Sequence, residues 1–426
     1  MPDCDKLEME HSSKSPSSQS GRASTFPDMR SLESHNKYPD CLWMQLEAIP
    51  VRSVAAQTEQ LHIHLSLNFN EHWEPLLGGR VKFGLQSGTL KLNLENCEIP
   101  VASRQLVGDF MLSPIQSSTQ VLFTENPAVV LESETAEKTK ENHGTLCHIS
   151  TLGDDTAPAW FFALERGDSV LKGLLKSVRV AELTAQPLRI AATFEVAKED
   201  IYITDAEGLW PHDITPNQHS VLERILTVYL QANKLQPALS WALLSYNLPA
   251  VEQPEVEIFP EAEAKLQEMV DRIISAETDN FTELAKIANL NPARDFAGAN
   301  LRGTTLNTVD FSSAKLQGTN FRGANLSDAD FSDANLQNAK FGGADLSGAF
   351  LGNADLSRAD LYRASLALAN LSGADLSRAN LLEVNFTNTN FSGTNVESAR
   401  FGNNSGLAED VKLNLQQGGA IFEDVE

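Results

Sequence analysis

The stretch that decides the fold is FRGANLSDADFSDANLQNAKFGGADLSGAFL, residues 321–351. A large apolar side chain recurs in it at every fifth position, and this register continues without a slip from Phe296 to Phe401. From residue 299 on, the position two before each apolar centre is Ala, Thr or Val, and the position directly before it is usually Asn or Asp. A period of five is neither that of an α-helix nor that of a β-strand. Each unit must therefore combine a short extended piece with a bend, and stacked units of this kind share one core, as in a solenoid.

The repeated units carry a family resemblance. Tandem units such as Ala324-Asn325-Leu326 and Ala374-Asp375-Leu376 resemble the pentapeptide-repeat proteins abundant in cyanobacteria. The lead-in at 290–301 and the ending at 418–424 are also similar to cyanobacterial members. The resemblance implies a right-handed quadrilateral β-helix over residues 293–403, called the rod below, in which each pentapeptide forms one side and its Leu or Phe points inward. The β-rich region before the rod resembles an uncharacterised region that precedes some such repeats.

Four sides per coil, taken from the resemblance, place residues twenty apart in adjacent coils. Phe311 is then expected to stack on Phe331, and Phe321 on Phe341, with Leu on the two sides between them. Rings that face each other across a core flanked by Leu keep its section uniform, as close packing requires. The core side chains predicted in this way are Phe311, Phe321, Phe331, Phe341, Leu346, Leu356, Leu366, Leu376, Phe391 and Phe401.

The same register predicts a candidate partner contact on the surface of the rod. Tyr362 and Leu382 are twenty residues apart and are expected to face water in a rod otherwise covered by Ser, Gly, Asn and Asp. Arg358 and Arg378 stack in the same way, each three residues after an Asp. Single exposed apolar residues are more common than contact patches, so the alternative is that Tyr362 and Leu382 bind nothing.

The rest of the chain is mainly β before the rod and helical on either side of it. Leu61, Ile63, Leu65, Leu67 and Phe69 alternate with polar residues, and 188–196 shows the same pattern, which is typical of half-buried antiparallel strands. The chain is predicted to begin with a disordered tail over 1–40 and a β-rich domain over 41–213, which has a polar loop near 132–144. A helical hairpin over 214–248 is expected to pack on this domain, followed by an acidic Pro-rich linker over 249–260. Helices over 261–292, which include a cap on the first coil, then lead into the rod over 293–403, and a cap helix and tail follow over 404–426.

Three local patterns support the predicted helices. Thr215-Pro216-Asn217-Gln218 forms a capping box with Pro at the first helical position, and a second short helix is expected near 236–246 with Trp241 and Leu244 inward. The C-terminal helix has one apolar stripe, formed by Leu407, Val411 and Leu415. We expect this stripe to cap the last coil, because a bare end would expose an unpaired edge; the alternative is a homodimer formed through this helix.

Charge and composition exclude several classes of protein. The chain has 426 residues, with 33 Lys and Arg against 57 Asp and Glu, a formal net charge of −24. This excess opposes a phosphate backbone, so no direct nucleic-acid binding is expected. No apolar run is long enough for a membrane span, and the N-terminus lacks the apolar core of a signal peptide. The four Cys are far apart and form no CxxC, which fits a reducing, cytoplasmic location.

Three groups of polar residues lack the pattern of a chemical site. His62 and His64 point the same way from one strand, but no third metal ligand is evident. Asp205, Glu207, His212 and Asp213 crowd a segment better explained as a polar turn before the capped helix, and His143, Cys147 and His148 have weak spacing. GxSxG, HExxH and GxxxxGK[ST] are absent from the sequence. The sequence therefore predicts no enzyme, no metal and no cofactor.

Two functions remain in view. The first is a non-catalytic scaffold for protein–protein interactions, with a partner protein that the sequence does not identify. The second comes from the resemblance: some family members mimic a DNA duplex and regulate DNA gyrase. Residues 296–401 contain ten acidic and eight basic residues, a net charge of −2, which is weak mimicry of a polyanion and places this function second.

Overall fold

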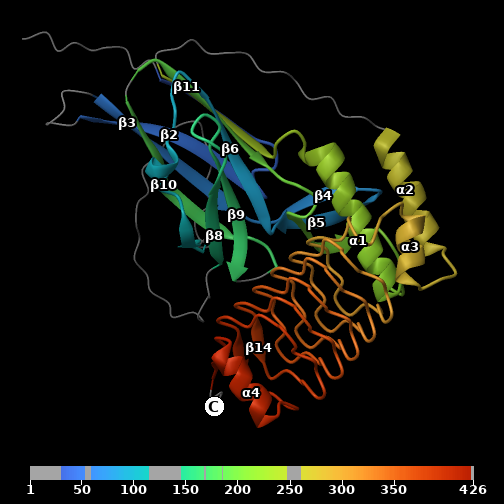
Figure 1. Ribbon diagram of the computed structural model, residues 1–426. Helices are drawn as coiled ribbons and strands as arrows, with labels where there is room; N and C mark the ends of the chain where they lie inside the picture. Colours follow the sequence, from blue (N-terminus) through green and yellow to red (C-terminus); the bar gives the residue numbers. More distant parts are fainter. Residues whose placement is uncertain are drawn as a thin grey trace, which may run out of the picture.

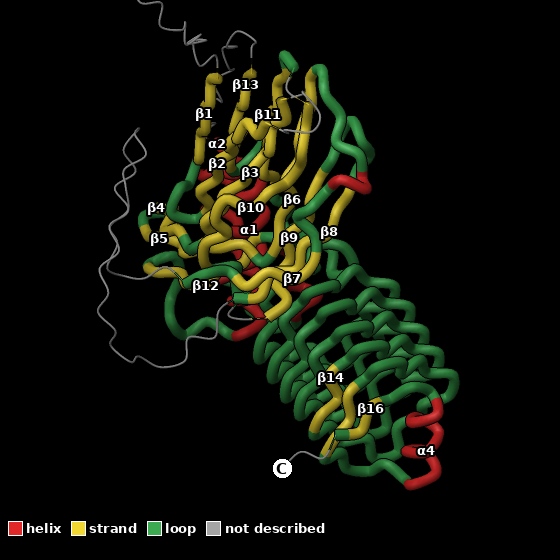
Figure 2. Tube along the Cα trace, turned by 90° about the vertical axis from the view of Figure 1, so that its left-hand side faces the viewer, coloured by secondary structure: helices red, strands yellow, loops and turns green. Residues whose placement is uncertain are grey.

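The computed structural model describes residues 30–52, 59–114, 145–166, 169–184, 186–246 and 261–423. A domain of β-sheets occupies one end of the molecule, and a stack of coils runs away from it (Figure 1). Helices lie beside the first coils, at the junction of the two parts, while the last helix lies at the free end of the stack (Figure 2). The described chain is mainly β. The predicted loop near 132–144, the linker over 249–260 and the first 29 residues of the predicted tail lie outside the described residues.

Three antiparallel sheets form the β-domain. The largest has seven strands in the order β1-β13-β11-β6-β9-β8-β7. The two others have three strands each, in the orders β10-β3-β2 and β12-β5-β4. The strands are β1 (Arg30–Asn36), β2 (Leu42–Arg52), β3 (Glu59–Phe69), β4 (His72–Leu76), β5 (Gly79–Leu85), β6 (Ser87–Glu95), β7 (Gly108–Met111), β8 (Leu146–Leu152), β9 (Ala159–Arg166), β10 (Gly173–Thr184), β11 (Leu188–Glu195), β12 (Ile201–Glu207) and β13 (Ser240–Tyr246).

The core of the β-domain follows from the alternation in its strands. In β3 every second side chain, from Leu61 to Phe69, is at most 1% exposed, and the intervening residues are half-buried. β11 shows the same pattern. Phe69 of β3 lies 6.1 Å from Phe162 of β9 and 5.8 Å from Phe194 of β11, measured between ring centroids. Because these rings come from two different sheets, they join the sheets face to face around one core.

Two segments differ from the expected structure. Residues 236–246 were expected to form a helix, but Ser240–Tyr246 form β13, between β1 and β11. An apolar run that is buried on both faces has no periodicity that separates helix from strand, so the two neighbouring strands decide the outcome. The predicted tail also extends too far, because Arg30–Asn36 form β1. Its backbone pairs with β13, with Leu32 opposite Leu244, and such a ladder requires few apolar side chains.

Three helices pack at the junction between the β-domain and the rod. α1 (Pro216–Leu230) begins with the predicted capping box, in which the Thr215 side chain accepts from the Gln218 amide and the Gln218 side chain accepts from the Thr215 amide. A π-helical turn, η2 (Gln231–Leu235), extends it, so the segment up to β13 is not a helical hairpin. α2 (Glu261–Ile274) buries Leu266, Val270 and Ile273. α3 (Phe281–Ile287) follows and lies against the first coil.

The rod is built from coils of twenty residues. Parallel bridges join residues twenty apart, from Asn300 with Asn320 to Asn385 with Ser405. The Asn or Asp before each centre has a local function: the Asp330 carboxylate, for example, accepts from the Ser332 amide at 2.8 Å, which closes the following turn. We call a set of residues twenty apart a ladder. Some ladders also join their side chains, as where the Asn380 amide donates to Asp360 at 2.9 Å.

The interior of the rod is a column of apolar side chains. Phe311 stacks on Phe331 with ring centroids 5.3 Å apart, and Phe321 stacks on Phe341 at 5.0 Å, as the twenty-residue spacing predicts. The two stacks meet edge to face, at 5.9 Å between Phe321 and Phe331. Of the ten predicted core side chains, nine are fully buried, whereas Phe391 is only half-buried because it lies in the last coils, where no further coil covers it.

Both ends of the rod are covered. At the first coil, Phe281 of α3 lies 4.9 Å from Phe296 and 6.0 Å from Phe311. At the far end, α4 (Glu409–Gln417) buries Leu415, and Leu407 and Val411 also pack against the core. Short strands β14 (Asn380–Leu382), β15 (Arg400–Gly402) and β16 (Ile421–Phe422) extend the stacking to the C-terminal segment. The apolar stripe of α4 therefore faces the rod.

Candidate partner-binding cleft

The site depends on how the rod is attached to the β-domain. Buried side chains of the sheets, α1, α3 and the coils form one continuous hydrophobic cluster. The backbones approach so closely at Gly298, which has a φ of +66°, that a Cβ there would collide with the Glu199 carbonyl. The two parts are therefore packed as one body.

Polar contacts from α1 fix the first coils. Arg224 is 2% exposed and donates to the Asp295 carbonyl and, at 3.1 Å, to the Lys198 carbonyl. Asn217 donates to the Thr305 carbonyl at 3.0 Å and accepts from the Thr305 amide at 2.9 Å. These bonds satisfy backbone groups that would otherwise be unpaired at the start of the rod.

A buried carboxyl group lies in the same joint. Glu223 of α1 is 8% exposed, accepts from the Asn300 side chain at 3.0 Å, and lies 3.6 Å from His219. Burial raises the pKa of Glu223 to about 8, and the Asn300 hydrogen bond opposes this shift only in part. Burial also lowers the pKa of His219. The joint therefore holds a carboxyl group that binds its proton more tightly than an exposed glutamate does.

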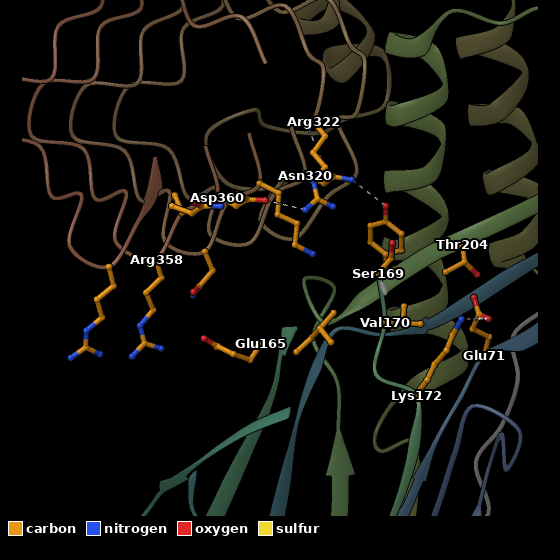
Figure 3. Close-up of a pocket in the computed structure, with 17 residues that line it drawn as sticks. Glu71, Glu165, Ser169, Val170, Lys172, Thr204, Asn320, Arg322, Arg358 and Asp360 are labelled. Atoms are coloured by element: carbon orange, nitrogen blue, oxygen red, sulfur yellow. Dashed lines mark hydrogen bonds and ion pairs between the residues drawn. The ribbon is translucent and has the colours of Figure 1, made fainter. Parts of the chain in front are cut away.

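One side of the rod and the edge of the β-domain enclose a cleft of about 790 Å³. Its rod wall carries Arg322, Lys340, Arg358, Asp360 and Arg378. Its other wall is formed by residues of the β-domain, which are Glu71, Leu164, Glu165, Ser169, Val170, Lys172, Tyr202 and Thr204. Figure 3 shows Arg358 and Asp360 on the coils, opposite Glu165 on the β-domain.

The cleft continues into a second hollow of about 630 Å³ along the same joint. The two share Leu164, Glu165, Asn338, Lys340 and Arg358, so they form one groove. "Cleft" below means both parts. Each part alone has the volume of a pocket for one small molecule, commonly about 300–1,000 Å³, so the two together have room for a larger ligand.

In the 790 Å³ part of the cleft, cations outnumber the acids that could neutralise them, whereas the second part adds Glu199 and Asp200. Lys172 pairs with Glu71 at 2.9 Å, and Arg322 pairs with Asp360 at 3.1 Å. Asp360 also accepts from Asn380 and from the Tyr362 amide, so its oxygens are occupied.

Three basic side chains of the rod wall remain. Within the described parts of the chain, Lys340, Arg358 and Arg378 form no ion pair, and on the opposite wall neither Glu165 nor Glu199, which lines the second part of the cleft, forms one. A positively charged wall is thus embedded in a protein whose net charge is −24.

The pKa of Lys340 depends on the burial and the charges at this wall. Its side chain is half-buried, and its pKa is lowered, first by burial and then by the nearby Arg322 guanidinium, with Asp360 acting in the opposite direction. Burial, the main cause, disfavours the charged form of the lysine, and the negative charge of Asp360 opposes this effect only in part. An anion bound in the cleft would act in the same direction as Asp360.

The predicted contact residues lie at or beside this cleft. Arg358 and Arg378 line it and are exposed. Tyr362 and Leu382 occupy the ladder of Arg322, beyond that of Lys340, and are half-buried. The reason is local packing: the Tyr362 hydroxyl donates to Glu383 at 2.9 Å, and the Arg363 guanidinium lies 4.8 Å from the centre of the Tyr362 ring.

Sequence reasoning missed part of the site and two exposed apolar residues. On the rod surface Lys340 occupies the ladder next to that of Arg358, and Arg322 occupies the one after it, but only the β-domain opposite them makes them part of a cleft. Phe350 is 51% exposed and Leu368 is 66% exposed on the rod. Both could have been found from the register, because each replaces the usual Gly, Asn, Asp or Ser at a surface position of the repeat.

The other polar groups have ordinary structural partners. His62 lies 3.3 Å from Glu182, and His64 contacts the Ser177 carbonyl at 2.9 Å. Glu207 pairs with Arg80, whereas the Asp205 carboxylate accepts from the Ala206 amide.

His212 and the third group do not assemble into a metal site either. His212 lines a separate hollow next to Trp210. His148 pairs with Asp109 at 2.6 Å, Cys147 is buried with a pKa raised to about 12 mainly by burial, and His143 lies outside the described residues. No group of three or more His, Cys, Asp or Glu in the described ranges is arranged to hold a metal ion.

Comparisons with known proteins identify the repeat. Family models described as pentapeptide repeats match residues 295–333, 364–403 and 316–360. A pentapeptide-repeat protein from the Arabidopsis thaliana thylakoid lumen is 32% identical over 30% of this chain and 79% of its own, with a TM-score of 0.20. None of the curated proteins matches the chain. Through its rod, this chain belongs to the pentapeptide-repeat family.

Two further solved structures are similar over the rod. A pentapeptide-repeat protein (Rfr23) from the cyanobacterium Cyanothece 51142 is 28% identical over 25% of this chain and 90% of its own, with a TM-score of 0.23. QnrB1, a plasmid-mediated fluoroquinolone resistance protein, is 18% identical over 31% of this chain and 90% of its own, with a TM-score of 0.14. Among the described helices, none is both long and apolar enough to cross a membrane.

Proposed function

We propose that this protein is a non-catalytic, cytoplasmic scaffold that binds a partner protein in the cleft between its rod and its β-domain. The observation that carries the proposal is the shared core at the joint, which holds two different surfaces at a fixed angle around an open groove. A groove preformed in this way binds without a large ordering cost. We take the rod to be a right-handed quadrilateral β-helix, which the twenty-residue spacing of its parallel bridges supports.

The charge of the cleft favours the scaffold over DNA mimicry. A mimic of duplex DNA presents negative charge, whereas the most enclosed face of this rod carries Lys340, Arg358 and Arg378. A gyrase supercoiling assay separates the two functions. We expect the full-length protein to leave supercoiling unchanged, and inhibition or protection of gyrase would favour the mimic instead.

The apolar stripe of α4 bears on the dimer alternative. Leu415 is 5% exposed, and Leu407 and Val411 pack on the rod, so the stripe is occupied within one chain. We propose a cap rather than a dimerising helix, and a monomer mass in light scattering is the expected result.

The scaffold is tested by capture of a partner from native lysate with the full-length protein. Cutting the chain between the β-domain and the rod would split their shared core, so fragments are unsuitable. We expect wild type to recover one protein at a fixed stoichiometry.

Two variants locate the binding surface. Asn338→Trp fills the cleft and is expected to abolish recovery, whereas Asn353→Trp makes the same change at an equivalent turn outside the cleft and should not; the two backbones have φ values of 57° and 55°. Tyr362→Ser/Leu382→Ser is expected to weaken recovery if that ladder contributes. Equal recovery by wild type and Asn338→Trp would refute the proposed surface.

A further inference from the structure

We propose that the cleft binds an extended acidic segment of the partner protein, with its carboxylates on the rod wall at Lys340, Arg358 and Arg378. This inference rests on the proposed scaffold function and names the chemistry of the partner. It is carried by the juxtaposition of three unpaired cations along one wall with a groove that runs past them.

The cations are arranged along the rod rather than around a point. Arg358 and Arg378 belong to one ladder and are therefore one coil apart, about 4.8 Å at strand spacing. Lys340 lies in the adjacent ladder and lines both parts of the cleft. A row of positive charges suits a ligand with several carboxylates in sequence, and Arg in particular can bind a carboxylate through two parallel hydrogen bonds.

The two arginines occupy a turn position that does not require arginine. Arg358 has a φ of 60° and Arg378 a φ of 59°, in the left-handed region that glycine tolerates best. The same position of other pentapeptide units holds Gly318, Gly343 and Gly373, but also Ser313, Asn353 and Leu368. The side chains of Arg358 and Arg378 are exposed and form no ion pair within the described residues, so both are available to a ligand.

The opposite wall distinguishes a peptide from a nucleic acid. Glu165 projects from the β-domain side of the cleft, as Figure 3 shows, and it would repel a second row of phosphates. A peptide backbone, by contrast, offers amide groups that can donate to Glu165 while its side chains reach the cations. The large negative charge elsewhere also disfavours a phosphate backbone.

The test measures fluorescence anisotropy of a labelled peptide of alternating Glu and Ser on the full-length protein. Wild type is expected to bind it, with affinity that falls as salt is raised. Arg358→Gly/Arg378→Gly is expected to bind about tenfold or more weakly. This variant keeps its fold because glycine adopts the same φ without strain, which a thermal melt verifies.

Two variants and a second peptide serve as controls. Arg358→Lys/Arg378→Lys should retain binding within about threefold, because the charges remain. Arg363→Gly removes an exposed arginine with the same φ, 59°, just outside the cleft, and should leave binding unchanged. A peptide of alternating Lys and Ser should not bind.

The outcomes that overturn the inference differ from those that overturn the scaffold. No binding of the acidic peptide by wild type, equal binding by Arg358→Gly/Arg378→Gly, or tighter binding of duplex DNA would refute the acidic segment. If Asn338→Trp still abolished capture of the partner in those cases, the scaffold would stand and only the chemistry of its ligand would change. If Asn338→Trp and wild type captured the partner equally, the site itself would be wrong.

Discussion

The rod and the β-domain each bury a core of apolar side chains, but the residues that pair in them are separated by very different distances along the chain. In the rod, each buried Leu or Phe is set by a register of five residues, and each backbone bridge joins residues twenty apart. In the β-domain, β1 pairs with β13, so Leu32 lies opposite Leu244. A repeat with local pairing can be deduced from any short piece of itself, whereas a sheet of this kind exists only when distant segments meet.

The comparison also explains where the site lies. The rod alone would have no second wall to form a pocket, and the β-domain alone would lack the rod's cations. The cleft arises where the two meet, because the rod's ladders of arginine and lysine face a wall that another part of the chain supplies. Function is thus assigned to the joint rather than to either part.

The largest expected effect tests whether the joint couples the two parts. Phe331→Ala leaves a cavity in the apolar column of the rod, where Phe331 is fully buried between Phe311, Phe321 and Phe341. The substitution should lower the free energy of unfolding by about 3–5 kcal/mol. All five Trp precede the rod, so Trp fluorescence follows the β-domain and α1 while circular dichroism follows the whole chain. In urea, both signals should shift together.

The outcome that contradicts coupling is a shift in circular dichroism alone. Such a result would mean that the rod unfolds independently, as a quasi-one-dimensional repeat can. Lys315→Ala, at an exposed rod position, is the control and should change stability by no more than about 0.5 kcal/mol.

A second effect tests the joint itself through pH. The pKa of Glu223 is about 8 in the folded protein against 4.5 as its ordinary value, so the folded state binds this proton more tightly than the unfolded state. Its contribution to stability is fully present below pH 4.5 and is lost as pH rises towards 8. Glu223→Gln should remove this dependence. As pH rises over that range, the free energy of unfolding of the variant should therefore increase by a few kcal/mol relative to that of wild type.

The measurement is the free energy of unfolding in urea at several pH values. His219 and Tyr202 are the nearby titratable groups, and both remain in the variant, so the difference between the two proteins isolates Glu223. Parallel curves for wild type and Glu223→Gln would show that this carboxyl group is not buried as described.

A third, smaller effect tests a local signal that the sequence displayed. Thr215→Ala removes the side-chain cap of α1 and should cost about 1 kcal/mol, whereas Thr215→Ser keeps the hydroxyl and should cost much less. Thermal melts of the three proteins check the order. If the Ala and Ser variants were equally stable, tertiary contacts rather than the capping box would hold this end of α1.

The smallest effect concerns the two arginines of the cleft. Arg358→Gly/Arg378→Gly relieves two left-handed residues and should leave stability unchanged or raise it by up to about 1 kcal/mol. Lys315→Gly, at an extended rod position, should lose about 0.5–1 kcal/mol. A marked loss for the arginine variant would show that these side chains stabilise the rod, which would contradict their proposed binding function.

Prediction from sequence succeeded where the determinants are close together in the chain. The alternation of β3 and the capping box at Thr215 were deduced from short patterns, and the stacking of Phe311 on Phe331 followed once the family resemblance supplied four sides per coil. It failed at residues 236–246, where an apolar run looked helical, and at residues 30–36, where a polar segment became a strand. Both errors involve the same two strands, because β1 and β13 pair with each other across the sheet.

The sequence alone determined that residues 293–403 form a five-residue repeat with a shared apolar core, whereas four sides per coil came from the family resemblance. It also pointed to Arg358 and Arg378 as a stacked pair. Only the tertiary structure decided that these arginines face Glu165 across a cleft and join Lys340 there, and that Tyr362 is half-covered. The physical reason is that a cleft depends on the angle between two packed bodies, and side chains more than a hundred residues apart, such as Tyr202 and Asn320, set that angle.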